Sequence, residues 1–189
     1  MDPLPIAEGA RIRLWDESEA AALTTLIAAN REHLMAWLPW AETHGFEDSV
    51  DYLWRKRMQV ERNDGFEGAI ELDGQIVGVV GFHAIDWLNR STSIGYWLTA
   101  KAQGRGLMSA AVRGLLDHAF GVWGLHRVII EVVVGNERSR AIPERLGFTQ
   151  EAILKEAKLI GGSYEDTRLY AMLAADWSSS SAREAIGSE

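Results

Sequence analysis

The sequence predicts an α/β domain in which helices flank a mixed, mostly antiparallel sheet, and three features support this fold class. Residues 70–72 alternate apolar and acidic positions, and Asp73-Gly74, a pair typical of a type I′ turn, connects them to an apolar run. Residues 107–123 repeat apolar side chains at helical spacing. Residues 128–134 form a nearly continuous β-branched run, which is typical of a buried central strand.

The N-terminal part of the chain predicts a short strand followed by two helices. The strand covers residues 11–15, and Asp16 with Glu19 forms the capping-box pattern that opens the first helix. The apolar side of this helix consists of Ala20, Leu23 and Ile27. A second helix is expected from about residue 48 to residue 62.

The remaining elements are predicted by the same patterns. A third antiparallel strand covers residues 92–98 and ends in a glycine-rich loop before the long helix. After the β-branched strand we expect a short helix over residues 139–145, a strand beyond Phe148, and a last hairpin that turns at Gly161-Gly162. The predicted order is strand, two helices, three antiparallel strands, helix, strand, helix and two strands.

The length and composition narrow the class of protein. A chain of 189 residues is long enough for one domain with its own core, which we place at residues 1–177, with residues 178–189 as a frayed tail. The chain has no cysteine, which excludes disulfides and thiol nucleophiles, and its five histidines show no ligand spacing, so we expect no metal. It has no signal-peptide pattern and no long apolar segment, so we expect a cytoplasmic protein that binds no membrane.

The charge of the chain is unevenly distributed. The formal net charge is −8, which argues against nucleic acid as a partner. Residues 101–145 nevertheless carry seven basic and four acidic side chains, so this segment is +3 and the remainder is −11. A local cationic region in an acidic protein favours a small anionic ligand.

A strand, a loop with Gly104 and Gly106, and a helix follow one another within residues 96–108. Glycines let successive N–H groups turn toward one point, and the N-terminus of the helix adds positive charge there. This pattern predicts a site for a phosphate or pyrophosphate, with a tight turn that binds nothing as the alternative. The loop lacks the Lys-Ser or Lys-Thr of a Walker sequence and only half satisfies a dinucleotide fingerprint.

Asn136 and Ser139 follow the central strand and, taken alone, are ordinary turn and cap residues. Together with the glycine loop, they resemble the GNAT superfamily of N-acetyltransferases, whose signature is Q/R-x-x-G-x-G/A. Here it reads Lys101-Ala-Gln-Gly104-Arg-Gly106, with Lys where Gln or Arg is usual. Within that superfamily the chain is similar to the RimJ/RimL branch, the ribosomal-protein N-terminal acetyltransferases. The resemblance covers residues 10–173, and its other motifs are Trp37-Leu-Pro-Trp40, Asn89-Arg90 before Ile94-Gly-Tyr-Trp97, and Leu146-Gly-Phe148.

The resemblance implies that acetyl-CoA is the cosubstrate and lies in a V-shaped cleft between two splayed strands, which end at Leu98 and Val134. Its pantetheine arm would pair with backbone near Trp97 and Leu98 and with Asn136, and its pyrophosphate would contact residues 103–108. The implied cofactor-binding residues are Trp97, Leu98, Gln103, Gly104, Arg105, Gly106, Leu107, Met108, Asn136 and Ser139.

The resemblance also implies direct attack of a primary amine on the thioester. Many relatives have a tyrosine seven residues after the Asn as general acid, but this chain has Pro143 there, so Ser139 is the expected proton donor to the leaving thiolate. Asn136 is implied to position the pantetheine arm, and Glu131, a lone acid in an apolar strand, is added to the catalytic candidates from the sequence itself. Ser93 occupies a position where some relatives have a carboxylate, which leaves the general base open.

Three residues are candidates for that base or for the acceptor site, each with an ordinary alternative. The alternative for Glu131 is that it points to solvent or pairs with Arg127. The alternative for His83 is a hydrogen-bonded residue at a strand end, and for Glu151 it is a solvated strand residue. Two further acceptor-site candidates, Trp37 and Trp40, form one wall of the acceptor cleft or pack in the core.

The favoured acceptor is a protein α-amino group, such as that of a ribosomal protein. At pH 7 roughly one α-amino group in seven is neutral, compared with about one lysine side chain in 2,500, so a weak base suffices for the former. The alternatives are a small amine (an aminoacyl compound, a polyamine or an antibiotic), a non-catalytic CoA-binding module, and nucleotide binding. We also expect a homodimer.

Overall fold

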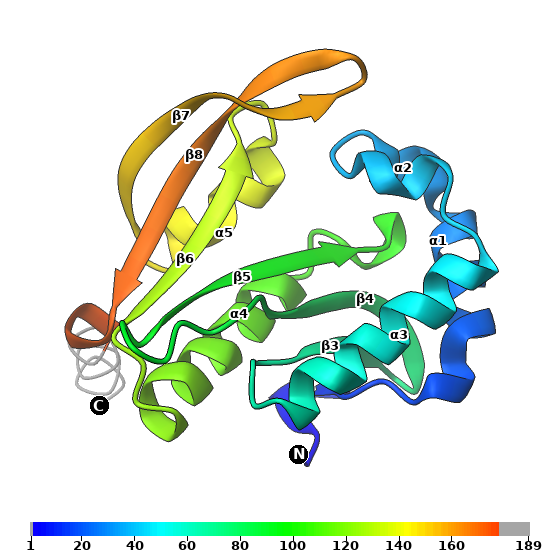
Figure 1. Ribbon diagram of the computed structural model, residues 1–189, viewed down its shortest axis with the longest axis horizontal. Helices are drawn as coiled ribbons and strands as arrows, with labels where there is room; N and C mark the ends of the chain where they lie inside the picture. The colour runs from blue at the N-terminus through cyan, green and yellow to red at the C-terminus, as the bar shows by residue number, and fades with distance from the viewer. Residues whose placement is uncertain (1, 178–189) are drawn as a thin grey trace.

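The computed structural model describes residues 2–177 and contains an eight-stranded sheet in the order β1-β2-β3-β4-β5-β6-β8-β7 (Figure 1). The tail predicted over residues 178–189 lies outside the described range. The strands are β1 (Leu4–Ala7), β2 (Ala10–Arg13), β3 (Glu67–Leu72), β4 (Gln75–Phe82), β5 (Ser91–Leu98), β6 (Arg127–Val133), β7 (Thr149–Ile160) and β8 (Ser163–Leu173). β5 and β6 are parallel and the other neighbours are antiparallel, which confirms the predicted fold class.

Helices cover the two faces of the sheet unequally. The helices are α1 (Ala20–Ala29), α2 (Arg31–Met35), α3 (Phe46–Glu61), α4 (Leu107–Asp117) and α5 (Glu137–Arg145). In Figure 1, α3 lies in front of β3 and β4, and α1 and α2 lie at the right, beyond the end of β5. α4 packs against the opposite face of the sheet. The front face of β6, β8 and β7 therefore has no helix in front of it (Figure 1).

The local signals near the N-terminus are confirmed with small differences in position. Asp16 accepts from the Ser18 N–H at 2.9 Å and Glu19 accepts from the Asp16 N–H at 2.8 Å, so the capping box is present. It opens a 3-10 turn before α1, whose predicted apolar side is buried. The first predicted strand ends at Arg13 instead of residue 15. β1 was not predicted because it is short and contains Pro5, which an edge strand tolerates.

The predicted hairpin is also confirmed. Asp73 has a φ of 50° and Gly74 a φ of 76°, so both central residues are in the left-handed region that a type I′ turn requires. The turn sets the register in which Leu72 lies opposite Gln75 and joins β3 to β4.

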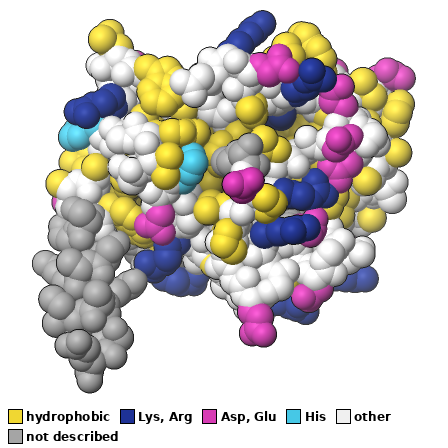
Figure 2. All heavy atoms as spheres, turned by 90° about the horizontal axis from the view of Figure 1, so that it is seen from below, with side chains coloured by type: hydrophobic (Ala, Val, Ile, Leu, Met, Phe, Trp, Pro, Cys, Tyr) yellow, Lys and Arg dark blue, Asp and Glu magenta, His cyan; other side chains and the backbone are white. Residues whose placement is uncertain are grey.

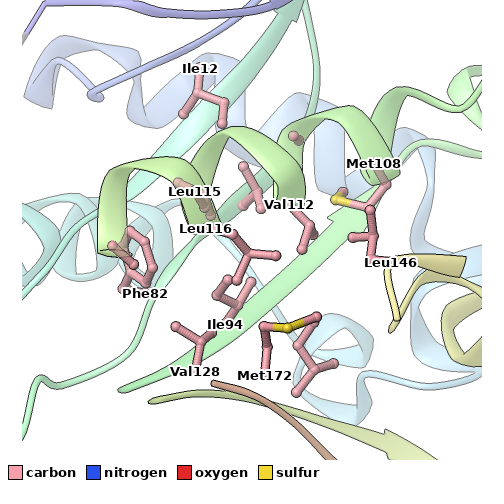
Figure 3. Close-up of a cluster of buried hydrophobic side chains, with 14 of the residues drawn as sticks. Ile12, Phe82, Ile94, Met108, Val112, Leu115, Leu116, Val128, Leu146 and Met172 are labelled. Carbon is pink, nitrogen blue, oxygen red and sulfur yellow. The ribbon is translucent and has the colours of Figure 1, made fainter. Parts of the chain in front are cut away.

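α4 supplies much of the main hydrophobic core, which lies between this helix and the sheet (Figure 3). Val112, Leu115 and Leu116 of α4 are fully buried and face Ile94 of β5 and Val128 of β6. A core shared by β5 and β6 stabilises the sheet at the position where these two strands meet. A smaller cluster is formed by buried residues of α1, α3 and the intervening segments: Ala20, Leu23, Ile27, Leu34, Ala41 and Leu53.

The helix predicted over residues 107–123 is wrong at its C-terminal end. The α-helix ends at Asp117 and a π-helical turn follows from His118 to Val122. The turn places Trp123 against Phe82, with ring centroids 4.9 Å apart, and against His118 at 4.5 Å. The π-helical turn therefore accompanies aromatic packing of Trp123. The apolar spacing in the sequence has the period of an α-helix, so it does not indicate this wider turn.

The prediction that residues 128–134 form a fully buried strand is half wrong. β6 is central, but Val128, Ile130 and Val132 are buried whereas Glu131 is exposed and Ile129 is half-buried. The reason is that α4 covers one face of β6 and no described helix covers the other. This open face contributes to the site described below.

The surface mixes charge and apolar groups. Seen from below, basic and acidic side chains alternate with hydrophobic ones (Figure 2), so the net charge of −8 does not form one acidic field on this face. Among residues 2–177, no helix has the length and apolar character needed to cross a bilayer. In the same part of the chain, no group of three or more His, Asp or Glu side chains has an arrangement suited to a metal ion.

Leu115→Ala is expected to lower the free energy of unfolding by about 3 kcal/mol, because it leaves a cavity in the core between α4 and the sheet. Urea denaturation followed by circular dichroism measures this change. Leu88→Ala is the matched control: Leu88 is 91% exposed, so its loss should change the free energy by less than about 0.5 kcal/mol. Equal losses in the two variants would contradict this description of the core.

Candidate functional site

The predicted splay of two neighbouring strands is present, and the opening between them is called the cleft below. β5 and β6 pair from Ser91 to Ser93 with Arg127 to Ile129, and then diverge (Figure 1). Beyond Ser93, β5 continues to pair with β4 as far as Leu98. The backbone groups of residues 94–98 that point toward β6 therefore lack a strand partner, and such groups need hydrogen bonds from a ligand or from water.

The loop at the open end of the cleft has the backbone that its glycines predict. Gly104 and Gly106 have φ values of 76° and 73°, in the left-handed region. A Cβ at either position would meet no heavy atom of the described chain within 4 Å, so the backbone conformation, and not a lack of space, requires glycine. α4 begins directly after Gly106, and no side chain of the described residues caps it. Its first N–H groups are thus available to an anion.

A chain of polar contacts crosses the mouth of the cleft. His33 Nε2 of α2 lies 3.2 Å from the Leu98 carbonyl oxygen and 3.0 Å from Gln103 Nε2. Arg138 of α5 donates to Gln103 Oε1 at 2.7 Å. These contacts bring the predicted residues Leu98 and Gln103 together. They also add His33 and Arg138, which were not predicted. The contacting residues are 35 to 70 positions apart in the chain, so no local sequence pattern indicates that they meet.

Asn136 and Ser139, predicted to act together, are adjacent at the start of α5. Asn136 is the N-cap, and its side-chain oxygen accepts from the Ser139 N–H at 3.2 Å. The Ser139 hydroxyl donates to the Tyr96 hydroxyl at 3.2 Å, and Tyr96 donates to the Ser139 carbonyl oxygen at 3.3 Å. Burial raises the pKa of Tyr96 to about 12, so its hydroxyl stays protonated. Tyr96 was not among the predicted site residues, although it lies inside a motif that carried the family resemblance.

His83 lies at the apex of the cleft, on the face of the sheet opposite α4. Its Nδ1 is 2.8 Å from the Ser93 hydroxyl, and a Cβ added at Gly95 would lie 2.6 Å from its Nε2. The imidazole therefore occupies the space over Gly95. Strand register puts Ser93 opposite Ile129, so Glu131, two residues further, faces the same side of the sheet.

The two predicted carboxylates differ in their partners. Glu131 is exposed and lies 3.9 Å from Lys158 Nζ, so the predicted alternative of a pair with Arg127 is wrong. Arg127 instead donates to Glu151 at 2.8 Å, and this guanidinium lowers the pKa of the Glu151 carboxyl group. Glu151 is therefore a weaker proton acceptor than an unpaired carboxylate.

The two predicted tryptophans do not pack in the core. Trp37 is 36% exposed and Trp40 is 44% exposed. The Trp37 ring lies 3.5 Å from the position that a Cβ at Gly135 would occupy, so it reaches from the α2 segment to the residue before Asn136. Trp40 contacts His44 edge-on, with ring centroids 5.4 Å apart. Of the two, Trp37 reaches a residue that borders the cleft.

A surface cavity of about 390 Å³ adjoins His83. It lies between the C-terminal half of α3 and the residues that follow β4. Its wall includes apolar groups of Trp54 and Met58 and the charged side chains of Arg62 and Asp64. A cavity of this size accommodates a small amine or a few residues of a peptide.

Comparison with known proteins gives consistent results. The family model described as "Acetyltransferase (GNAT) domain" matches residues 10–149. The "Putative ribosomal N-acetyltransferase YdaF" of Bacillus subtilis is 34% identical over 176 residues, which span 91% of this chain and 95% of that protein. The "Ribosomal-protein-serine acetyltransferase" of Escherichia coli is 29% identical over 173 residues, or 91% and 97%. The solved structure of RimL, a ribosomal α-N-protein acetyltransferase, in complex with coenzyme A has a TM-score of 0.88 at 29% identity and covers 93% of this chain and 99% of that one.

Proposed function

Because the chain belongs to the GNAT family and is an acyl-CoA-dependent N-acetyltransferase, we propose that its acceptor is the α-amino group of a protein, with a ribosomal protein as the favoured substrate. The structural observation that supports the proposal is the divergence of β5 from β6 beside the uncapped N-terminus of α4. Relatives whose names specify ribosomal-protein acetylation align with 91% of this chain and support the choice of acceptor. Small amines are the competing acceptors.

Acetyl-CoA supplies an activated thioester, and the cleft contains groups suited to each part of it. The unpaired backbone near Trp97 and Leu98 is suited to the amides of the pantetheine arm. The N–H groups of residues 103–108 are suited to the diphosphate. Asn136 keeps its side-chain NH₂ for the arm, since its oxygen is used as the N-cap. A backbone N–H near Trp97 is suited to polarising the thioester carbonyl.

Each proton in the transfer has a candidate group. His83 takes the proton that the attacking amine loses, because its imidazole is exposed beside the apex of the cleft. The C–S bond breaks with its electron pair on sulfur, and the Ser139 hydroxyl gives that sulfur a proton. His83 then releases the amine proton to solvent, and the Ser139 oxygen takes a proton back from solvent. The transfer therefore releases and consumes one proton each. Glu131 remains a second candidate for the base, and Glu151 is disfavoured by its pair with Arg127.

The acceptor would reach the thioester from the side of His83. The adjoining cavity, with Trp54 and Met58, offers apolar contacts for the first side chains of a peptide. Trp37 borders the opposite part of the cleft, next to Gly135. Since an α-amino group has a pKa of about 7.8, a single imidazole is a sufficient base for it near neutral pH.

A screen of acceptor-dependent CoA thiol release tests the proposal. Short peptides with different N-terminal residues are compared with free lysine, polyamines and aminoacyl compounds, at fixed acetyl-CoA. Faster release with the peptides supports the protein α-amine. Faster release with a small amine would overturn the proposed acceptor, and so would equal rates with peptides and small amines.

Three further assignments rest on the same proposal. We propose that residues 1–177 form one N-acetyltransferase domain, of which the family model covers residues 10–149. We also propose a cytoplasmic location and a homodimer. Sedimentation of the purified chain distinguishes a dimer from a monomer.

His83→Gln is expected to lower kcat about tenfold at pH 7 with a peptide acceptor, because water replaces the imidazole as base. The loss should shrink to about twofold at pH 9, where most of the α-amine is already neutral. His126→Gln is the matched control, since that exposed histidine hydrogen-bonds through its backbone N–H and carbonyl groups, which glutamine retains. Rates measured from pH 6 to pH 9 give both profiles. A tenfold loss that stays constant with pH would contradict a role for His83 as base.

A further inference from the structure

Tyr96 connects β5 to α5 on the helix-covered side of the cleft. Its side chain packs against the main core, and its hydroxyl lies 3.2 Å from the Ser139 hydroxyl and 3.3 Å from the Ser139 carbonyl oxygen. Among residues 2–177, no other side chain hydrogen-bonds to the Ser139 hydroxyl. Tyr96 is therefore the direct neighbour of the group proposed to protonate the leaving sulfur.

The two hydroxyl groups admit two arrangements of their protons. In one, Tyr96 donates to the Ser139 carbonyl and the serine proton points at the phenolic oxygen, so it is unavailable to a ligand. In the other, Tyr96 donates to the Ser139 hydroxyl oxygen, and the serine proton is free to turn away from Tyr96. The two distances differ by 0.1 Å, so rotation of the hydroxyl groups is enough to exchange the arrangements.

We propose that Tyr96 is a positioning residue for Ser139, which holds the serine hydroxyl in the second arrangement when the thioester is bound. This inference rests on the proposed function, in which Ser139 protonates the sulfur. Tyr96 transfers no proton in it: the phenol keeps its hydrogen atom and donates a hydrogen bond to the serine oxygen. The serine proton is then turned away from Tyr96 and is free to reach the departing sulfur. This hydrogen bond also stabilises the serine oxygen as its own proton leaves.

Tyr96→Phe removes the phenolic O–H and keeps the ring in the core. We expect kcat to fall about tenfold, with the KM for acetyl-CoA changed less than about twofold. The decisive measurement is the same substitution in a Ser139→Ala background, where it should change kcat less than about twofold, because the group it positions is gone.

Tyr170→Phe is the matched control. Tyr170 is also a buried tyrosine that donates to α5, but its partner is Glu144 at 2.8 Å and not Ser139. Its loss should leave kcat within twofold of the wild-type value. Thermal denaturation of all variants separates effects on folding from effects on the reaction.

The outcomes separate this inference from the proposed function. A wild-type kcat for Tyr96→Phe, or a tenfold loss that persists in the Ser139→Ala background, overturns the role of Tyr96 alone. If Ser139→Ala itself keeps the wild-type kcat, the proposed proton donor fails, and the positioning role of Tyr96 fails with it.

Discussion

Ser139→Ala is expected to lower kcat about 100-fold and to change the Kd for acetyl-CoA less than about threefold. General acid catalysis by a positioned side chain contributes roughly 10² to 10⁴ in rate, and this variant removes the proposed proton donor. Binding should be preserved because Asn136 caps α5 through the backbone N–H of Ser139, which alanine retains. Stopped-time CoA release at saturating acetyl-CoA gives kcat, and calorimetry gives Kd.

Ser163→Ala is the control for this experiment, since Ser163 is exposed at the start of β8 and distant from α5 in the chain. Its kcat should match that of the unaltered protein. A 100-fold rise in Kd with kcat unchanged would instead make Ser139 a binding residue, and unchanged values of both constants would remove it from the mechanism.

Gly106→Val is expected to weaken acetyl-CoA binding about 100-fold, which corresponds to about 2.7 kcal/mol. The φ of 73° at this position is costly for a β-branched residue, so the loop should change its backbone to a negative φ. That change redirects the N–H groups at the start of α4, which are proposed to hold the diphosphate. Calorimetry with acetyl-CoA measures the loss.

Gly121→Val provides a matched control for Gly106→Val. Both glycines have open space around the position of a Cβ, but Gly121 has no left-handed φ. The control should bind acetyl-CoA normally, while both variants keep a cooperative unfolding transition. Normal binding by Gly106→Val would mean that the diphosphate is not held by this loop.

The sequence predicted the parts of the fold that depend on residues close together in the chain. The capping box at Asp16 and the turn at Asp73-Gly74 depend on residues within four positions of each other. Gly104 and Gly106 adopt left-handed conformations that glycine permits at no steric cost. The splayed arrangement of β5 and β6, by contrast, was expected from the family resemblance and not from periodicity.

The parts that sequence reasoning missed depend on distant residues. Tyr96 and Ser139 are 43 positions apart, and His33 and Gln103 are 70 apart, so no spacing indicates that they touch. The helix-free face of β6 was missed because a β-branched run is compatible with burial on one face or on both. Which face stays open depends on where α1, α2 and α3 pack, which is a tertiary property.

The three-residue contact between β5 and β6 has a thermodynamic consequence. The two strands join the β1–β4 part of the sheet to the β6–β8 part through Ser91–Ser93 and Arg127–Ile129, with α4 packed behind both. A ligand that hydrogen-bonds to both diverging strands adds a bridge that the bare chain lacks. Such a ligand binds the native state in preference to the denatured chain, so at 100 times its Kd it would add about 2.7 kcal/mol of stability. The resistance of this protein to heat and proteolysis would thus follow the acetyl-CoA level of its surroundings.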